Sequence, residues 1–229
     1  MSGIHPSTSP NPQARPRRRG GARAALVAIP LAAGILGAIV IPTLAATGGH
    51  AADPASLTCQ GEGVDPSAEV RYRTETFIKA PLRTVWELQT DVKSWPSWQE
   101  PVTTAESLDP GRFRKNSQFR WTTPVPPTPV SPATTLVITS TVQQLQQNKC
   151  IRWTGPAIGE GLRIDGVHVW SFTEVNGGVL VRTEETHTGP QVDADVPLAT
   201  DHLGKGLEAW LAALKATAES RHYNPTGNA

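Results

Sequence analysis

The stretch from Pro197 to Ser220 constrains the fold of this chain more than any other feature of its sequence. Apolar side chains recur there at spacings of three and four residues, which places them on one wide stripe of a helix about six turns long. They are Leu203, Leu207, Trp210, Leu211, Leu214 and Ala218. So wide a stripe needs a broad partner, and the preceding segments alternate as short β-strands do. The sequence therefore predicts an α+β fold in which a sheet holds this helix.

Two glycines, Gly204 and Gly206, interrupt the predicted helix. Each weakens a helix interior by roughly 1 kcal/mol relative to alanine. They indicate either close approach of the helix backbone to the sheet or space left for a bound molecule. Loss of helix propensity near a frayed end is the third explanation, and the sequence leaves all three open.

The N-terminal part of the chain differs in composition from the rest. Residues 1–23 are basic and predicted to be disordered, and residues 24–46 form an uncharged segment that reads as a signal sequence or a transmembrane anchor. Its most apolar part, Ala24 to Ile41, approaches the ~20 residues that span a bilayer. Thr43 to Ala45 provides a small-residue context for cleavage, so both outcomes stay open. Residues 47–68 are predicted to be a linker with Cys59 as its one anchor.

Either outcome gives the same topology, because the arginines tend to stay in the cytoplasm. The sequence thus predicts an extracytoplasmic domain over residues 69–222 with a tail at 223–229, anchored in the cell membrane by residues 24–46 or secreted after cleavage. Without the five leader arginines, sixteen basic residues remain against twenty acidic ones, a net charge of −4. Nucleic acid is therefore not an expected partner. The oligomeric state is not predicted.

The chain has two cysteines, Cys59 and Cys150. In an oxidising compartment an even pair favours a disulfide, which here would tie the N-terminal extension to the edge of a strand. The alternative is two thiols too far apart to bond.

Alternation of apolar and polar residues predicts strands at 70–79, 117–121, 136–144, 150–154, 166–174 and 179–187, in a sheet of about six or seven strands. Asn176-Gly177-Gly178 predicts a hairpin between the last two. Ala80-Pro81 begins a short helix that ends near Asp91, and a second helical turn is expected around Trp95. Five prolines between Pro124 and Pro132 predict an extended loop outside the sheet, either a stiff flap over a pocket or a rigid connector.

Several short motifs occur in one order along the chain: Ile78 to Pro81, Val85-Trp86, Asp91, Trp95-Pro96, Trp98, Phe119, Trp121, His168 to Phe172, Glu185 to Gly189, Leu211 to Lys215 and Glu219. In this order they resemble the START-like superfamily, and within it the polyketide cyclase/dehydrase and lipid-transport group, often labelled SRPBCC. The resemblance spans Val70 to about Arg221. It implies a helix-grip fold, in which a curved antiparallel sheet wraps around the C-terminal helix and encloses a mostly apolar cavity. The leader and the long proline-rich segment depart from the family pattern.

Three polar residues would face one cavity if the predicted hairpin strands pair: His168, Glu185 and His187. As catalytic candidates they would serve as acid and base in cyclisation or dehydration. Alternatively, they satisfy one another or orient the polar end of a ligand. No pair of histidines has helical spacing and no acidic cluster accompanies them, so neither a metal nor a cofactor is predicted.

The predicted ligand-pocket residues are Trp98, Trp121, His168, Trp170, Phe172, Glu185 and Trp210. Trp95 and Trp98 would line the cavity entrance, meet a membrane, or only anchor their short helix. The function expected first is that of an exported or membrane-anchored START-like domain which binds a hydrophobic small molecule or lipid without catalysis. A cyclase, aromatase or dehydratase is the second reading, and an interaction domain with a filled core is the third.

Overall fold

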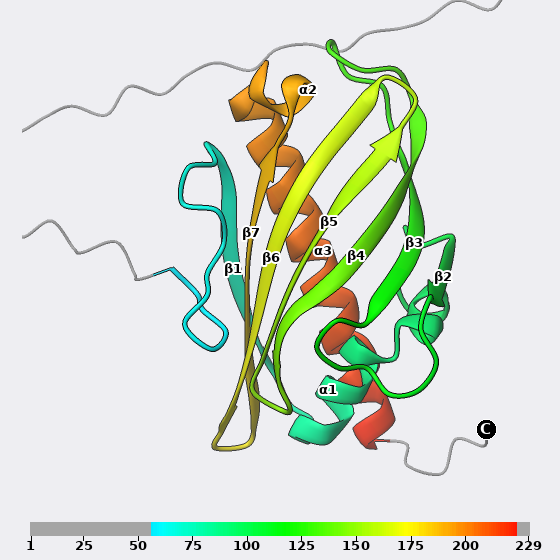
Figure 1. Cartoon of the computed structure of the whole chain (residues 1–229). Coiled ribbons are helices and arrows are strands. Elements are labelled where there is room, and N and C mark those ends of the chain that lie inside the picture. The colour runs from blue at the N-terminus through cyan, green and yellow to red at the C-terminus, as the bar shows by residue number, and fades with distance from the viewer. Residues whose placement is uncertain (1–55, 224–229) are drawn as a thin grey trace, which may run out of the picture. The chain divides into compact units, whose positions relative to one another are not determined.

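The computed structural model describes residues 56–223, in which one long helix, α3 (Val196–Tyr223), lies across the inner face of a curved sheet (Figure 1). Five of the six residues in its apolar stripe are buried and Trp210 is partly buried, as the spacing predicted. Asp195 precedes the helix and accepts a hydrogen bond from the backbone N–H of Leu198 at 3.1 Å. This contact caps the N-terminus of α3.

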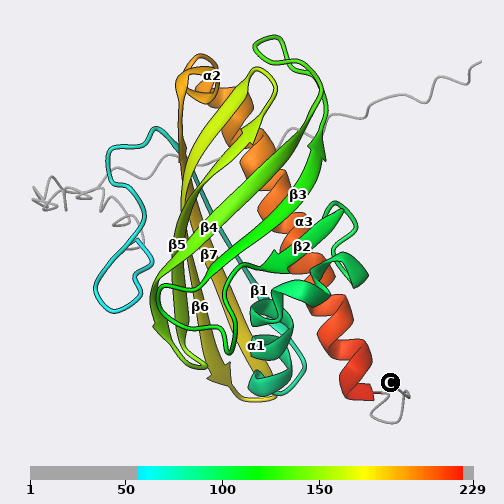
Figure 2. The ribbon, with the colours of Figure 1, turned by 45° about the vertical axis from the view of Figure 1, so that its right-hand side comes forward.

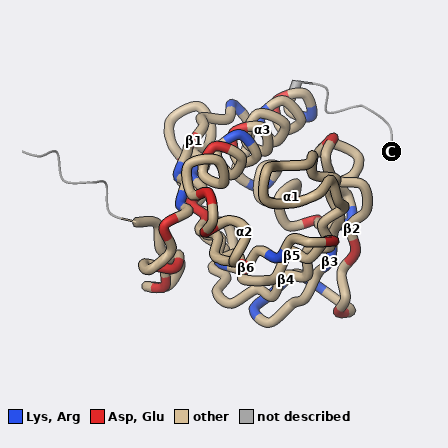
Figure 3. Tube along the Cα trace, turned by 90° about the horizontal axis from the view of Figure 1, so that it is seen from above, with Lys and Arg blue, Asp and Glu red and all other residues tan. Residues whose placement is uncertain are grey.

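The sheet has seven antiparallel strands in the order β1-β7-β6-β5-β4-β3-β2. The strands are β1 (Val70–Ile78), β2 (Thr104–Ser107), β3 (Gln118–Val125), β4 (Thr134–Gln146), β5 (Cys150–Gly159), β6 (Leu162–Val175) and β7 (Gly178–Thr188). Seen from above, β6, β5, β4 and β3 lie on the side opposite α3, and β1 lies beside α3 (Figure 3). The predicted α+β helix-grip fold is confirmed. Only β2 was not located from the sequence, because its four residues include no large apolar side chain.

Three shorter helices flank α3: α1 (Leu82–Thr90), the 3-10 helix η1 (Val92–Ser97) and α2 (Pro190–Asp193). α1 lies beside the C-terminal half of α3, where it and η1 close one end of the fold (Figure 2). The interior there is filled by a cluster that includes Trp86, Trp95, Phe172, Leu211 and Leu214. The core is therefore packed at the α1 end, and the single turn of α2 lies at the opposite end (Figure 1).

The two helix glycines have different surroundings. A Cβ atom at Gly204 would lie 2.7 Å from the ring of Tyr72 on β1, so this glycine permits close approach of α3 to the sheet. A Cβ at Gly206 would meet no atom within 4 Å. Close approach of the helix to the sheet thus accounts for Gly204, and open space beside the helix agrees with the second explanation for Gly206.

The segment that precedes β1 packs on the outer face of the sheet. The backbone N–H of Leu57 donates to the buried Glu184 on β7 at 2.6 Å, and Arg152 on β5 donates to the carbonyl of Gly63 at 2.7 Å. Cys59 forms a disulfide with Cys150, with 5.4 Å between their Cα atoms. The prediction of a linker with one anchor is wrong for residues 56–68, because polar groups of the sheet bind it at several further points.

The proline-rich segment enters the sheet, contrary to the prediction. Pro124 belongs to β3 and lies opposite Thr135 of β4, beyond the last β3 residue that pairs with β2, Thr122. A proline lacks the N–H of a ladder bond but is tolerated where a strand has an open edge. The loop proper begins after Val125 and is closed by a bridge between Thr128 and Ser131.

Within residues 56–223, no helix has both the length and the apolar composition that crossing a bilayer requires. The predicted basic segment at 1–23, the predicted signal or anchor at 24–46, residues 47–55 of the predicted linker and residues 224–229 lie outside the described residues.

Alanine substitution should separate the roles of the two glycines. Gly206→Ala is expected to raise the free energy of unfolding by up to about 1 kcal/mol through helix propensity. Gly204→Ala is expected to lower it by about 1–3 kcal/mol, because the new methyl group overpacks against Tyr72. Urea denaturation of both variants measures the difference, and an equal change in the two would contradict it.

Removal of the disulfide by the double substitution C59A/C150A is expected to lower the free energy of unfolding by about 4–5 kcal/mol, because the bond closes a long loop in the unfolded chain. Guanidinium unfolding of the oxidised protein and the double variant tests this. A reductant should destabilise the parent protein and leave the double variant unchanged; a loss below about 1 kcal/mol would show that the loop closure contributes little.

Candidate functional site

A cavity of about 510 Å³ lies between α3 and the sheet. Its wall comes from β3 to β7, from the proline-rich loop after β3 and from α2 and α3. Most of this wall is apolar and includes Val125, Leu136, Ile138, Leu162 and Ile164. The volume falls within the range of small-molecule sites, roughly 300–1,000 Å³. The loop of prolines therefore forms part of a cavity wall.

Tryptophans separate the cavity from the packed end of the core. Trp95, Trp121, Trp153, Trp170 and Trp210 all line it. The rings of Trp95 and Trp210 meet edge to face with centroids 4.9 Å apart, and those of Trp121 and Trp210 do so at 5.7 Å. Such contacts hold the large rings in fixed positions, so this part of the wall is rigid and aromatic.

Five of the seven predicted pocket residues line the cavity: Trp121, His168, Trp170, Glu185 and Trp210. Phe172 lies outside the lining because it is two residues further along β6, where its ring packs against Trp86 of α1 at 5.3 Å. Trp98 also lies outside it and packs at the end of η1 against Trp210, with 6.0 Å between ring centroids. Both positions correct the prediction, since the α1 end of the interior is filled.

The three predicted polar residues come together on the wall of the cavity. His168 and Glu185 are cross-strand partners on β6 and β7, and His187 lies two residues beyond Glu185 on the same face of β7. Nδ1 of His168 is 3.1 Å from Oε2 of Glu185, and Nε2 of His187 is 3.2 Å from Oε1. The sequence predicted this group correctly because the turn at Asn176 to Gly178 sets the register of the hairpin.

Burial and the neighbouring charges together determine the protonation of the group. Burial lowers the pKa of His168 to about 4 against the opposing attraction of Glu185, so this imidazole is neutral at pH 7. Burial also raises the pKa of Glu185, but His168 and His187 outweigh this effect and hold the pKa of the carboxyl below its usual value. An ionised carboxylate only accepts, so a proton on Nδ1 of His168 is the tautomer that suits its contact with Glu185. Nε2 of His168 makes a hydrogen bond with the hydroxyl of Thr183 at 2.6 Å.

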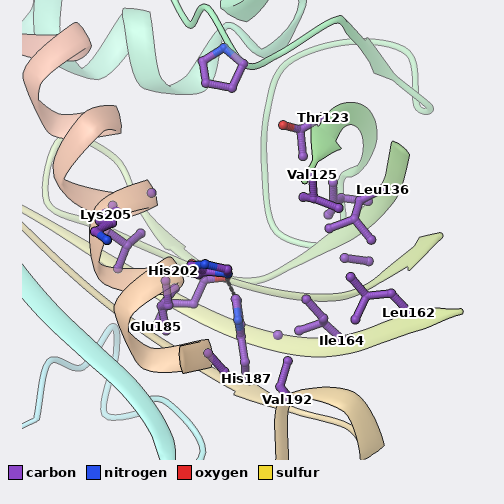
Figure 4. Close-up of a pocket in the computed structure, with 18 of the residues that line it drawn as sticks. Thr123, Val125, Leu136, Leu162, Ile164, Glu185, His187, Val192, His202 and Lys205 are labelled. Carbon is purple, nitrogen blue, oxygen red and sulfur yellow. Dashed lines mark ion pairs between the residues drawn. The ribbon is translucent and has the colours of Figure 1, made fainter. Parts of the chain in front are cut away.

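The structure adds lining residues that the sequence analysis did not single out. Two of them, His202 and Lys205 of α3, lie on the same side of the pocket as Glu185 and His187, whereas Val125, Leu136, Leu162 and Ile164 lie across from them (Figure 4). Gly155 and Gly166 are directly opposite each other on β5 and β6. His202 and Lys205 lie off the buried apolar stripe of the helix, so the helix period could have indicated them. No sequence signal marks the paired glycines. Among residues 56–223, no group of three or more His, Cys, Asp or Glu side chains has the arrangement of a metal site.

The sequence matches the family described as polyketide cyclase / dehydrase and lipid transport over residues 67–219. The chain belongs to this family. It therefore also belongs to the START-like superfamily that the sequence motifs resemble. No curated protein matches the chain in sequence.

Solved structures with the same fold share little sequence with this family member. An aromatase/cyclase from Streptomyces sp. R1128 has a TM-score of 0.52 and 16% identity, over 69% of this chain and 98% of its own. A START superfamily protein from Mycobacterium smegmatis has a TM-score of 0.50 and 16% identity, over 66% and 97%. A hypothetical protein from Helicobacter pylori has a TM-score of 0.51 and 14% identity, over 71% and 99%. At these identities the likeness shows the fold alone.

Stability should depend on pH through His168. Below pH 6.5 the unfolded chain gains a proton on this residue, whereas the folded protein gains it only near pH 4, so the free energy of unfolding falls as the pH falls between these values. The loss reaches about 3 kcal/mol at most. Glu185 adds a further loss as the pH falls through its lowered pKa, in the same direction.

Urea denaturation at intervals between pH 7 and pH 4 measures this dependence. His168→Asn is expected to flatten it, and the same substitution at the exposed His202 is the matched control, which should keep the slope of the parent protein. If His168→Asn and the parent protein have equal slopes, His168 is not the residue responsible.

Proposed function

We propose that this protein binds a hydrophobic small molecule or lipid in its internal cavity and does not act as an enzyme. The observation that carries the proposal is the cavity of about 510 Å³ under α3, lined mainly by apolar and aromatic side chains. A folded chain gains stability when side chains fill such a space. In this protein the α1 end of the core is filled in that way, whereas the cavity under α3 is not. Gly206 keeps α3 from filling it, since its missing side chain faces open space.

Burial of the ligand's apolar surface supplies the affinity, at about 25 cal/mol for each Å² removed from water. The tryptophan wall is already held in place by edge-to-face contacts, so binding costs little ordering of side chains. The His168 and Glu185 side chains fix the orientation of a polar group on the ligand. The family to which the chain belongs includes lipid-transport proteins by its description, in agreement with this role.

We further propose that the domain works outside the cytoplasm, held at the membrane by residues 24–46 or released after cleavage. The arginine-rich start and the uncharged run that follows it support export. The disulfide between Cys59 and Cys150 supports an oxidising compartment. Carbonate extraction of membranes separates the two forms, since an anchored chain stays in the pellet at full length.

The cavity is tested by filling it. Native mass spectrometry of the protein purified from its own cells is expected to show a co-purifying apolar molecule. Gly206→Phe is expected to abolish this adduct, because the new ring enters the cavity from α3. Ala212→Phe adds the same ring at an exposed position of α3 outside the lining and should keep the adduct. Loss of the adduct in both variants, or its absence from the parent protein, would contradict the proposal.

An enzyme of the cyclase, aromatase or dehydratase type is the second candidate. The contacts of Glu185 with His168 and His187 favour it, because a neutral imidazole beside a carboxylate is suited to proton transfer. His168→Ala and Glu185→Ala should then abolish turnover of a polyketide-like substrate and leave its binding intact. If both variants lose only affinity, the polar group orients a ligand and the enzymatic reading fails.

A further inference from the structure

The carboxylate of Glu185 retains unused capacity to accept hydrogen bonds. Each oxygen of a carboxylate accepts about two, and one imidazole lies against each oxygen, at 3.1 Å and 3.2 Å. Both ion-pair partners of Glu185 within the described residues are histidines rather than lysine or arginine. The side chain is 18% exposed and lines the cavity, so what remains of this capacity is open to the cavity.

Lys205 is the one lysine or arginine among the described residues that line the cavity, and its ion-pair partner is not Glu185. Its ammonium group is paired with Asp201 one helical turn earlier on α3, with 2.7 Å between Nζ and the carboxylate oxygen. Both side chains are largely exposed, at 72% and 50%. Water screens exposed ion pairs of this kind, so the charge of Lys205 acts only weakly on groups inside the cavity.

The cavity wall beside Glu185 contains two glycines, Gly155 and Gly166, which have no side chains. Gly155 and Gly166 face each other across β5 and β6, between the pair of Trp153 with His168 and the pair of Ala157 with Ile164. A Cβ at Gly166 would lie 3.3 Å from Oε1 of Glu185. The missing side chain leaves this oxygen open to a bound molecule.

The indole of Trp170 lies in the wall beside His168. Trp170 is completely buried, lines the cavity and packs beside His168 with 4.8 Å between ring centroids. Its indole Nε1 makes no hydrogen bond with any described residue. A buried N–H without an acceptor costs about 1–3 kcal/mol. This nitrogen has almost no accessible surface, so a molecule in the cavity does not reach it and the selection of a ligand falls to Glu185.

We propose that the ligand of this cavity is a hydroxylated apolar molecule, an alcohol or a phenol, and that the cavity rejects the carboxylic acid of the same skeleton. This inference rests on the proposed binding function. A hydroxylated ligand supplies a donor for Glu185. A ligand carboxylate has no proton to donate to Glu185 and brings a like charge beside it in a poorly hydrated site.

Four pyrene derivatives provide the test, because they share one flat apolar body. The probes are 1-pyrenemethanol, 1-pyrenecarboxylic acid, 1-pyrenemethylamine and, without a polar group, 1-methylpyrene. Fluorescence titration at pH 7 of the delipidated full-length protein gives each Kd, and the signal of Gly206→Phe is subtracted as uptake outside the cavity. The alcohol is expected to bind about tenfold or more tightly than the acid, with 1-methylpyrene between them.

Glu185→Gln removes the charge and keeps the shape of the side chain. It is expected to reduce the ratio of the acid and alcohol Kd values to less than about threefold. Glu160→Gln, at the exposed β5–β6 turn outside the lining, removes one negative charge elsewhere and should keep the full ratio. If Glu185→Gln does not fold, as judged by circular dichroism, Gly166→Ala tests the same point by placing a methyl group beside the carboxylate.

The outcomes are distinct. If 1-methylpyrene binds but the acid binds as tightly as the alcohol, the selection for hydroxyl is wrong and the binding function stands. If the amine alone binds tightly, the ligand is a cation and the hydroxyl proposal is likewise wrong. A full ratio retained in Glu185→Gln or in Gly166→Ala excludes Glu185 as the selecting group. If no probe binds beyond the signal of Gly206→Phe, the proposed function itself fails.

Discussion

Burial of the apolar stripe of α3 against the sheet is the interaction on which the rest of the structure depends. The stripe runs the length of the helix, but its surroundings change along it. Leu211, Leu214 and Ala218 enter a core filled by α1, η1 and the lower strands. Leu203 and Leu207 instead pack with Val70 and Val192 and also line the cavity. One continuous sequence pattern thus packs the C-terminal half of the helix into a filled core and places its N-terminal half over the cavity.

The cavity is kept open by residues that lack side chains as much as by those that have them. Gly204 lets α3 approach Tyr72, and Gly206, two residues later, presents no side chain to the interior. On the opposite wall, a Cβ at Gly155 would lie 2.1 Å from the carbonyl oxygen of Thr139, so close backbone packing alone requires that glycine. Its partner Gly166 meets only looser contacts, of which the nearest is Glu185. The same residue type therefore has a packing role at two positions and a space-making role at the other two.

Sequence periodicity was sufficient for the elements whose pattern is long, and for the site residues that a hairpin brings together. The helix period identified α3, and the turn at Gly177 fixed the register that pairs His168 with Glu185. Periodicity was insufficient where the depth of a residue in the fold decides whether it lines the cavity. Phe172 has the same facing as Trp170 on β6, but α1 covers one and the cavity borders the other. Alternation gives the face of a strand and not the depth at which a residue lies, so it does not distinguish Phe172 from a pocket residue. Trp98 lies at the end of the short helix η1, where no period indicates which way its side chain faces. The packed segment at 56–68 has no periodicity, and its contacts depend on polar groups such as Glu184 that are distant in sequence.

Glu184 and Glu185 are neighbours on β7 whose side chains lie on opposite faces of the sheet. Successive side chains of a strand point to opposite faces, and here the outer one is held by Leu57 while the inner one borders the cavity. A single peptide unit thus separates the segment that leads back toward the N-terminus from the polar group that would meet a ligand. A shift of β7 at Glu185 would therefore reach the contact between Glu184 and Leu57 through one peptide unit.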